Sequence, residues 1–148
     1  MAVNRRHMAG VAPSQVLATL CDGRSYGDWV VGTRKVREVS PQWPAPGTAI
    51  HYTVGYAPFR KDDVTWSRAF DPAGCLELEA QVWPMGTLMI VIRVEDDPGG
   101  ATVVIDEYAE KGLLRTLHNP LFDVAIKARN VETLRRLEKQ ARRRPATV

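Results

Sequence analysis

The sequence predicts an α+β domain in which a curved antiparallel sheet of about seven strands wraps around one long C-terminal helix. Two observations predict this fold. Residues 33–110 alternate apolar and polar side chains with the period of a β-strand, whereas apolar side chains recur every three or four positions after residue 120. A short strand and two short helices precede the alternating region. Because a sheet with one apolar face must bury it, we expect the terminal helix to cover that face.

Residues 1–32 are expected to form one strand and two short helices. Residues 3–8 alternate as a strand. Pro13 lies in the first turn of a helix, and Gly23 follows that helix as a left-handed cap. Ser25 is expected to cap a second short helix, which ends at Gly32.

Six further strands are expected in the central region. The segments between them are rich in Pro, Gly and Asp, as in residues 71–74 and 96–100, and such residues form turns. Short connections of this kind join antiparallel neighbours. The expected strands span residues 33–39, 48–56, 62–71, 75–83, 87–96 and 101–110.

The last helix is the best defined element of the sequence. Asn119 is expected to be its N-cap and Pro120 its first residue. Its apolar stripe, expected to face the sheet, contains Val124, Ala128, Val131, Leu134, Leu137 and Ala141. The opposite, water-facing side is expected to carry Arg129, Glu132, Arg136 and Lys139.

Size and composition indicate a single globular domain. The chain has 148 residues, of which 45% are hydrophobic and 25% charged. We expect residues 1–144 to form the domain and residues 145–148 to be a disordered tail. No apolar stretch approaches the ~18 residues of a membrane span. Pro13 comes too early for a secretory signal, so we expect a cytoplasmic protein without stable membrane insertion.

The net charge of +3 is located at the C-terminal end. The last fourteen residues contain six Lys or Arg residues and one Glu, and the rest of the chain has fourteen basic and sixteen acidic residues. Cations near a helix C-terminus complement the helix dipole. We therefore expect no nucleic-acid partner, because the basic residues are not spread over the domain.

The motifs of several enzyme classes are missing. His7, His51 and His118 lie far apart, and Cys21 and Cys75 do not complete a zinc site and are expected to be free thiols. There is no P-loop, no G-x-G-x-x-G and no G-x-S-x-G. The sequence therefore predicts no metal, no cofactor and no covalent nucleophile.

One carboxylate falls on the apolar face of a strand. Alternation in residues 101–110 places Glu107 on the same side as Val103 and Ile105. A buried carboxylate forms an ion pair, has a shifted pKa or contacts a polar ligand. Arg68 is the candidate partner, because alternation assigns it to the same strand face as Trp66.

The candidate pocket residues come from the inward strand positions, the helix starts and the last helix. A base would be Glu107 or His118, and a hydrogen-bond donor would be Tyr52 or Tyr108. The residues expected to contact a ligand are Trp29, Tyr52, Trp66, Arg68, Glu107, Phe122 and Ile126.

The second face of the strand at residues 87–96 also carries apolar residues. Met89 and Val91 alternate with the inward positions of this strand. They are either ordinary exposed apolar side chains or a contact between two copies of the chain. We therefore expect a monomer or a weak homodimer.

Three segments carry a resemblance to a known family. They are residues 26–32 (YGDWVVG), residues 103–108 (VVIDEY) and residues 129–137 (RNVETLRRL). With the order of elements, they resemble the SRPBCC superfamily, which includes START domains and the birch-pollen allergens, and in particular its bacterial polyketide cyclase/dehydrase and lipid-transport family. The resemblance implies a helix-grip fold with a cavity between sheet and helix. Members of this superfamily include aromatase/cyclases, ubiquinone-binding proteins, hormone receptors and lipid carriers.

Three functions follow from these observations. The first is non-catalytic binding of a hydrophobic small molecule, such as a lipid, a polyketide or an isoprenoid. The second is a cyclase or dehydratase with a pocket Glu or His as base and a Tyr as donor. The third is an interaction module, which a filled core without a cavity would favour.

Overall fold

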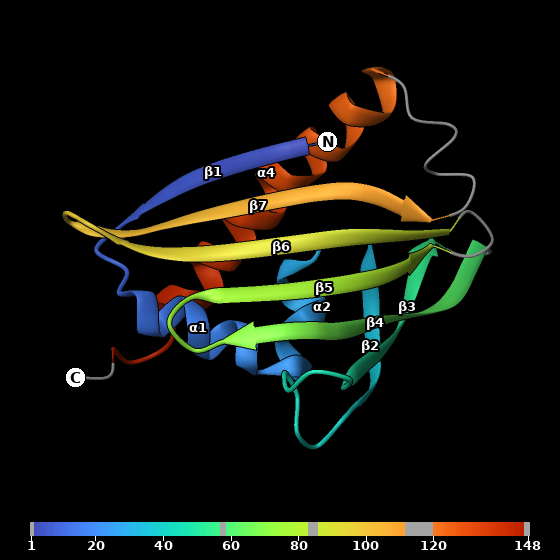
Figure 1. Cartoon of the computed structure of the whole chain (residues 1–148), viewed down its shortest axis with the longest axis horizontal. Coiled ribbons are helices and arrows are strands. Elements are labelled where there is room, and N and C mark those ends of the chain that lie inside the picture. The colour runs from blue at the N-terminus through green and yellow to red at the C-terminus, as the bar shows by residue number, and fades with distance from the viewer. Residues whose placement is uncertain (1, 57–58, 83–85, 112–119, 147–148) are drawn as a thin grey trace.

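In the computed structural model, which describes residues 2–56, 59–82, 86–111 and 120–146, a seven-stranded sheet packs against one long helix (Figure 1). The strands are β1 (Ala2–Ala9), β2 (Thr33–Val39), β3 (Ala49–Tyr56), β4 (Phe59–Asp71), β5 (Cys75–Val82), β6 (Gly86–Asp97) and β7 (Gly100–Lys111). The helical segments are α1 (Pro13–Cys21), η1 (Gly23–Ser25), α2 (Tyr26–Trp29) and α4 (Pro120–Arg142).

Strands β2 to β7 form an antiparallel meander, and β1 is the edge strand beside β7. Its order is β1-β7-β6-β5-β4-β3-β2, and every neighbouring pair is antiparallel. Because β1 pairs with β7, the chain must cross to the far edge of the sheet before β2, and α1 and α2 make this crossing. Figure 1 shows α4 passing behind the sheet on the same side as α1 and α2. The predicted helix-grip α+β fold is confirmed. Among the described residues, none of the helices has the length and apolar character that a membrane crossing requires.

One end of the interface between α4 and the sheet is tightly packed. This sealed end consists of side chains that are at most 2% exposed: Met8, Val11, Val16, Leu20, Leu137 and Ala141. The Gln15 amide of α1 donates hydrogen bonds to the carbonyl oxygens of Ala141 (3.2 Å) and Arg144 (2.6 Å). The Ala141 carbonyl also accepts from the Arg144 amide at 3.1 Å, so the Gln15 amide adds a bond from another helix at the point where α4 ends. Gln15 therefore holds the C-terminal end of α4 against α1.

The apolar stripe predicted for the last helix is correct only in its second half. Leu134, Leu137 and Ala141 are buried as predicted. Val124 and Val131, by contrast, are 63% and 56% exposed, and Ala128 is exposed as well. The buried face in the first half contains Ile126, Asn130 and Thr133 instead. The prediction failed there because it assumed that apolar residues face the sheet, whereas polar residues occupy the inward positions.

Strand β4 changes face at a β-bulge. Its ladder with β5 shifts register between Ser67 and Ala69. Trp66, before the shift, faces away from the helix together with Arg68, whereas Phe70, after the shift, packs against the core. Unbroken alternation would place Trp66, Arg68 and Phe70 on one face, but a bulge inserts one residue and reverses the alternation beyond it.

Arg68 pairs with Glu79 on the outer face of the sheet. The Arg68 guanidinium donates to Glu79 Oε2 at 2.9 Å and lies 5.5 Å from the centre of the Trp66 ring. Glu79 is only 8% exposed beneath this guanidinium. The predicted pair between Arg68 and Glu107 is therefore wrong, because the two side chains lie on opposite faces of the sheet.

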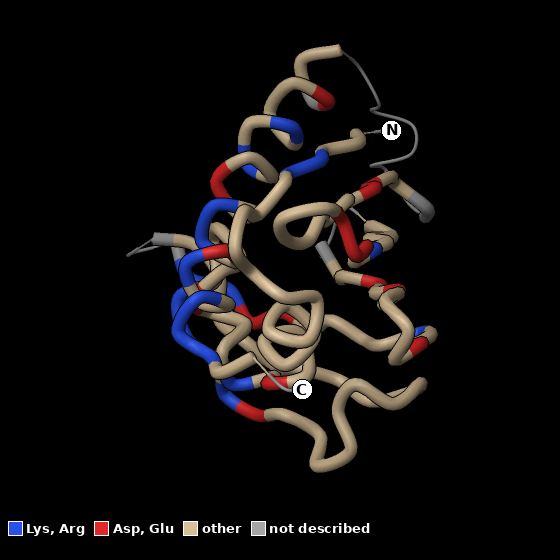
Figure 2. The backbone as a smooth tube through the Cα atoms, turned by 90° about the vertical axis from the view of Figure 1, so that its left-hand side faces the viewer, with Lys and Arg blue, Asp and Glu red and all other residues tan. Residues whose placement is uncertain are grey.

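Basic residues gather on one side of the molecule, along α4 and β1 (Figure 2). Many of them are paired with carboxylates. Glu132 accepts from Arg135 and Arg136, and Glu138 accepts from Arg6 and Arg142. These pairs neutralise much of the local positive charge. That the protein has no nucleic-acid partner stays a prediction.

Candidate functional site

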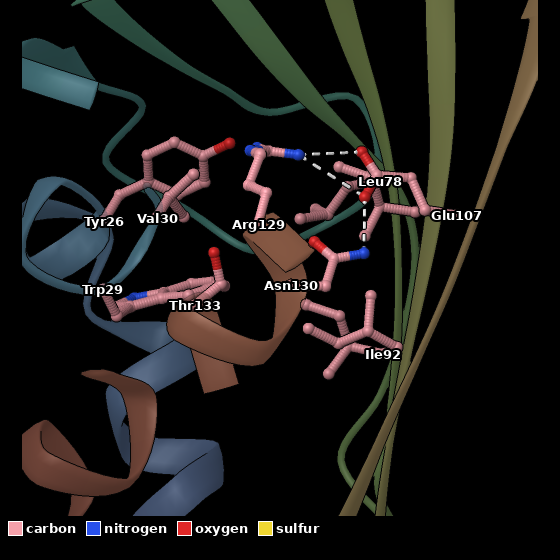
Figure 3. Close-up of a pocket in the computed structure, with 11 residues that line it drawn as sticks. Tyr26, Trp29, Val30, Leu78, Ile92, Glu107, Arg129, Asn130 and Thr133 are labelled. Atoms are coloured by element: carbon pink, nitrogen blue, oxygen red, sulfur yellow. Dashed lines mark hydrogen bonds and ion pairs between the residues drawn. The ribbon is translucent and has the colours of Figure 1, made fainter. Parts of the chain in front are cut away.

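Two adjacent cavities lie between the sheet and the first half of α4. The larger has a volume of about 340 Å³, and the smaller, inner one has a volume of about 20 Å³. Five residues line both: Tyr26, Val30, Ile90, Glu107 and Arg129. The side chains of Glu107 and Arg129 therefore border both cavities. Figure 3 shows them among the residues that line the smaller one.

Glu107 is placed there by the register of β7. It pairs with Ile90 of β6, so both side chains project from the inward face of the sheet. Only 1% of Glu107 is exposed. A carboxylate at such a position is costly unless charged or polar groups compensate it.

Two residues of α4 provide that compensation. Arg129 Nη1 donates to Glu107 Oε1 at 3.1 Å and to Oε2 at 3.4 Å. Asn130 Nδ2 donates to Oε2 at 2.8 Å. Figure 3 shows both side chains reaching from the helix toward the sheet. Both oxygens of the carboxylate thus accept hydrogen bonds from α4.

The segment after α2 fixes the same part of α4. Arg129 Nε donates to the carbonyl oxygen of Val31 at 3.3 Å, and the Val31 amide donates to Thr133 Oγ1 at 3.4 Å. Arg129 is therefore held at two points, one on β7 and one after α2. Its side chain is still 34% exposed, so it is not enclosed by protein.

A second polar group on the cavity wall consists of three hydroxyls. The hydroxyls of Tyr26 and Tyr52 lie 3.0 Å and 2.8 Å from Thr65 Oγ1. The two rings are 5.1 Å apart between centroids. Three hydroxyls carry three protons, and the two bonds among them use two. The third can be shared between Tyr26 and Tyr52, whose side chains also interact with each other.

Burial raises the pKa of both tyrosines above the ordinary value. For Tyr26 and for Tyr52, removal from water is the largest cause, and it disfavours the phenolate. Both side chains consequently stay protonated near neutral pH. They act as hydrogen-bond donors or acceptors rather than as bases.

The rest of the larger cavity is mainly apolar. Asp63 is the other acidic residue on its wall, and its Oδ2 lies 3.8 Å from Lys61 Nζ. The apolar side chains on the wall are Val30, Val31, Val54, Ala80, Leu88, Ile90 and Ile126. A volume of about 340 Å³ lies within the range of small-molecule sites, which is about 300–1,000 Å³.

The inner cavity is large enough for a water molecule. Its volume of about 20 Å³ exceeds the minimum of about 10–15 Å³ for one water. Trp29 lines it, and the buried Nε1 of that indole has no hydrogen-bond partner among the described residues. Among those same residues, no three His, Cys, Asp or Glu side chains form a group that could hold a metal ion.

The structure brings together some of the predicted site residues and separates others. Glu107, Tyr52 and Ile126 line the larger cavity, and Glu107 and Trp29 line the inner one. That they contact a ligand stays a prediction. His118 and the side chain of Phe122 lie outside the described part of the structure.

Three of the predicted residues project from the outer face of the sheet. Tyr108 follows the inward Glu107 and pairs with Met89, so it points away from the cavity. Trp66, which pairs with the outward Glu79, and Arg68 lie on that face, opposite to Phe70 beyond the bulge in β4. Their predicted location in the pocket is wrong.

Sequence reasoning missed the two residues that bind Glu107. Arg129 was assigned to the water-facing side of the helix, and Asn130 was not considered. One signal could have found them: Ile126, Asn130, Leu134 and Leu137 recur every three or four residues, with Arg129 at the edge of that stripe. A buried carboxylate on the facing strand is costly without a partner, so a cation on the helix that covers it is a candidate partner.

Solved structures share this fold. The crystal structure of Ara h 8.0201 matches with a TM-score of 0.73 and 15% identity, over 96% of this chain and 97% of that one. Protein NE0264 from Nitrosomonas europaea matches with a TM-score of 0.74 and 13% identity, over 95% and 93% of the two chains. DynU16, from the dynemicin biosynthetic locus, matches with a TM-score of 0.68 and 12% identity, over 93% of this chain and 45% of that one.

Comparisons of sequence give no match. No family model matches the chain, and a search of curated proteins finds no similar one. At identities this low, the structural likeness concerns the fold alone. The shared fold is the helix-grip α+β fold that the resemblance of the sequence implied.

Proposed function

We propose that this protein binds a hydrophobic small molecule in the larger cavity, as a binder or carrier that does not transform its ligand. The observation that carries the proposal is a cavity of about 340 Å³ with mainly apolar walls, which ends at a buried polar cluster. The apolar walls of such a site bury the apolar surface of a ligand, and the polar cluster at its end orients one polar group of that ligand. Lipids, polyketides and isoprenoids have this combination.

The alternative, a cyclase or dehydratase, has less support. A general base must be free to accept a proton from its substrate. Both oxygens of Glu107 already accept hydrogen bonds from Arg129 and Asn130. The hydrogen-bond donors of such an enzyme would be Tyr26 and Tyr52. Among the described residues of the cavity wall, Asp63 is the only other candidate base besides Glu107. Binding therefore accounts for the arrangement without a reaction.

A cavity-filling variant tests the proposal. Ala80 is 7% exposed and lines the larger cavity, so Ala80→Phe places a ring inside it. The matched control is Val91→Phe, because Val91 projects from the outer face, where it pairs with Glu77 and Asp106. Binding of the uncharged dye Nile red is followed by fluorescence.

We expect wild type and Val91→Phe to bind the dye saturably at one site. Ala80→Phe should bind it at least about tenfold more weakly, because the ring occupies the volume that the dye needs. Circular dichroism checks that each variant is folded. Equal dye affinity in folded Ala80→Phe and wild type would contradict binding in this cavity.

A further inference from the structure

We infer that the ligand is uncharged at its inner end and accepts hydrogen bonds there, and that Glu107 determines this preference by neutralising Arg129. The inference rests on the proposed binding function and specifies its ligand class. A ketone, an aldehyde, an ester or an alcohol fits this description, whereas a free carboxylic acid does not.

The first step concerns the charges that face the larger cavity. Among the described residues on its wall, these are Arg129, Glu107 and Asp63. Arg129 is paired with Glu107 at 3.1 Å, and Asp63 lies 3.8 Å from Lys61. The described part of the cavity wall therefore presents no uncompensated cation to a ligand.

The second step concerns an anionic ligand. A carboxylate that contacts Arg129 would also lie close to Glu107, because Nη1 of that arginine contacts both Glu107 oxygens. Attraction and repulsion then act over similar distances and largely cancel. The carboxylate would still lose its hydration on entering the apolar cavity, and the Arg129–Glu107 pair supplies no net positive charge to compensate for that loss.

The third step concerns the donor that remains. Arg129 Nη2 has no acceptor within hydrogen-bond distance among the described residues, and the side chain is 34% exposed. Arg129 is a residue of the larger cavity wall. An uncharged oxygen on the ligand satisfies this donor without bringing a charge into the cavity.

The role of Glu107 follows from its position on the wall of both cavities. Replacing its carboxylate with the amide of Gln keeps the shape of the side chain and an oxygen that accepts from Asn130. The substitution removes the negative charge and leaves Arg129 as an unpaired cation at the wall. A ligand carboxylate would then find a cation without a competing anion, and charge-assisted bonds are stronger than neutral ones.

The experiment compares dodecanol with dodecanoate, which share an alkyl chain and differ in the charge of the end group. Calorimetry at neutral pH gives the affinity of wild type and Glu107→Gln for each. The control is Glu79→Gln, which removes a buried carboxylate that is likewise paired with an arginine, Arg68, but on the outer face.

We expect wild type and Glu79→Gln to bind dodecanol at least about tenfold more tightly than dodecanoate. Glu107→Gln should reverse this order. Tighter binding of dodecanoate by wild type would overturn the inference, even if Glu107→Gln failed to fold. An unchanged ratio in folded Glu107→Gln would overturn it as well.

The outcome also separates this inference from the proposed function. Saturable binding of Nile red together with a preference for dodecanoate would contradict only the ligand class. Binding of neither compound, with Ala80→Phe equal to wild type toward Nile red, would overturn the binding function and the inference together.

Discussion

The two halves of α4 pack on the same sheet in different ways. The second half places Leu134, Leu137 and Ala141 against the core, each at most 2% exposed. The first half turns Asn130 and Thr133 inward, beside two cavities. In the second half, close packing stabilises the fold. In the first half, polar groups replace apolar contacts, and two cavities remain between the helix and the sheet.

The first half of α4 is less suited to stabilising the fold than the second half. Buried ion pairs add little net stability, because desolvation offsets most of their attraction. The cluster of Glu107, Arg129 and Asn130 is therefore a poor way to stabilise a core and a good way to present a fixed polar group in a cavity. Places where local rules are broken are the expected places for function.

The largest expected effect comes from opening a cavity at the sealed end. Leu137→Ala should lower the free energy of unfolding by about 4 kcal/mol, because the site is fully buried and cannot collapse readily. Ile126→Ala, in the first half, should cost less than about 2 kcal/mol, because that side chain already borders a cavity. Urea unfolding of both variants gives the comparison. Equal losses would mean that the two halves pack alike.

The next effect comes from breaking the buried ion pair. Arg129→Met leaves the carboxylate of Glu107 without its cation and should cost about 3 kcal/mol. In the double variant Arg129→Met/Glu107→Gln, most of this loss should be recovered, because no uncompensated charge stays buried. Urea unfolding of the single and double variants measures both values. A double variant no more stable than the single one would show that the charge is not the cause.

A smaller effect is expected for the tyrosines. Tyr52→Phe removes one bond to Thr65 and should cost about 1 kcal/mol, because Tyr26 still holds that hydroxyl. Tyr108→Phe is the control on the outer face and should change the unfolding free energy by less than about 0.5 kcal/mol. Thermal and urea unfolding test both. A larger loss in Tyr108→Phe would contradict its outward position.

The smallest effect concerns the surface of α4. Hydrogen bonds from Arg135 and Arg136 lower the pKa of Glu132 from 4.5 to about 2. A carboxyl group whose pKa is lower in the folded state stabilises the protein at pH values above its pKa in the unfolded state. This stabilisation is lost as the pH falls through the pKa of the folded state. The difference in stability between wild type and Glu132→Gln should therefore shrink between about pH 5 and about pH 2. Urea unfolding across this range measures it, and a difference that is constant with pH would contradict the ion pairs.

The sheet and the order of elements could be predicted from the sequence because alternation and turn residues are local signals. Glu107 and the inward positions of β7 follow from alternation alone, and the structure confirms that face. The bulge in β4 gave no such signal, so the orientation of Trp66 and Arg68 was predicted wrongly. A bulge is a property of two paired strands, and one strand alone does not reveal it.

The polar part of the site could not be predicted from the pattern of α4. Amphipathicity assigns polar residues to water, and it assigned Arg129 there while Val124 and Val131 were assigned to the core. The helix instead turns Arg129 and Asn130 toward the sheet, where both bind the carboxylate of Glu107. The contact between residues 107 and 129 joins two elements that only the tertiary fold brings together.

The most direct test of the proposed function is native mass spectrometry of the protein purified without detergent, followed by organic extraction of bound molecules. We predict a bound mass that extraction removes, from an uncharged molecule with a long apolar part and a polar oxygen at one end. Ala80→Phe should lose this mass, and Val91→Phe should keep it. A mass retained equally by Ala80→Phe would contradict binding in the cavity, as would an apo protein that binds none of the uncharged probes.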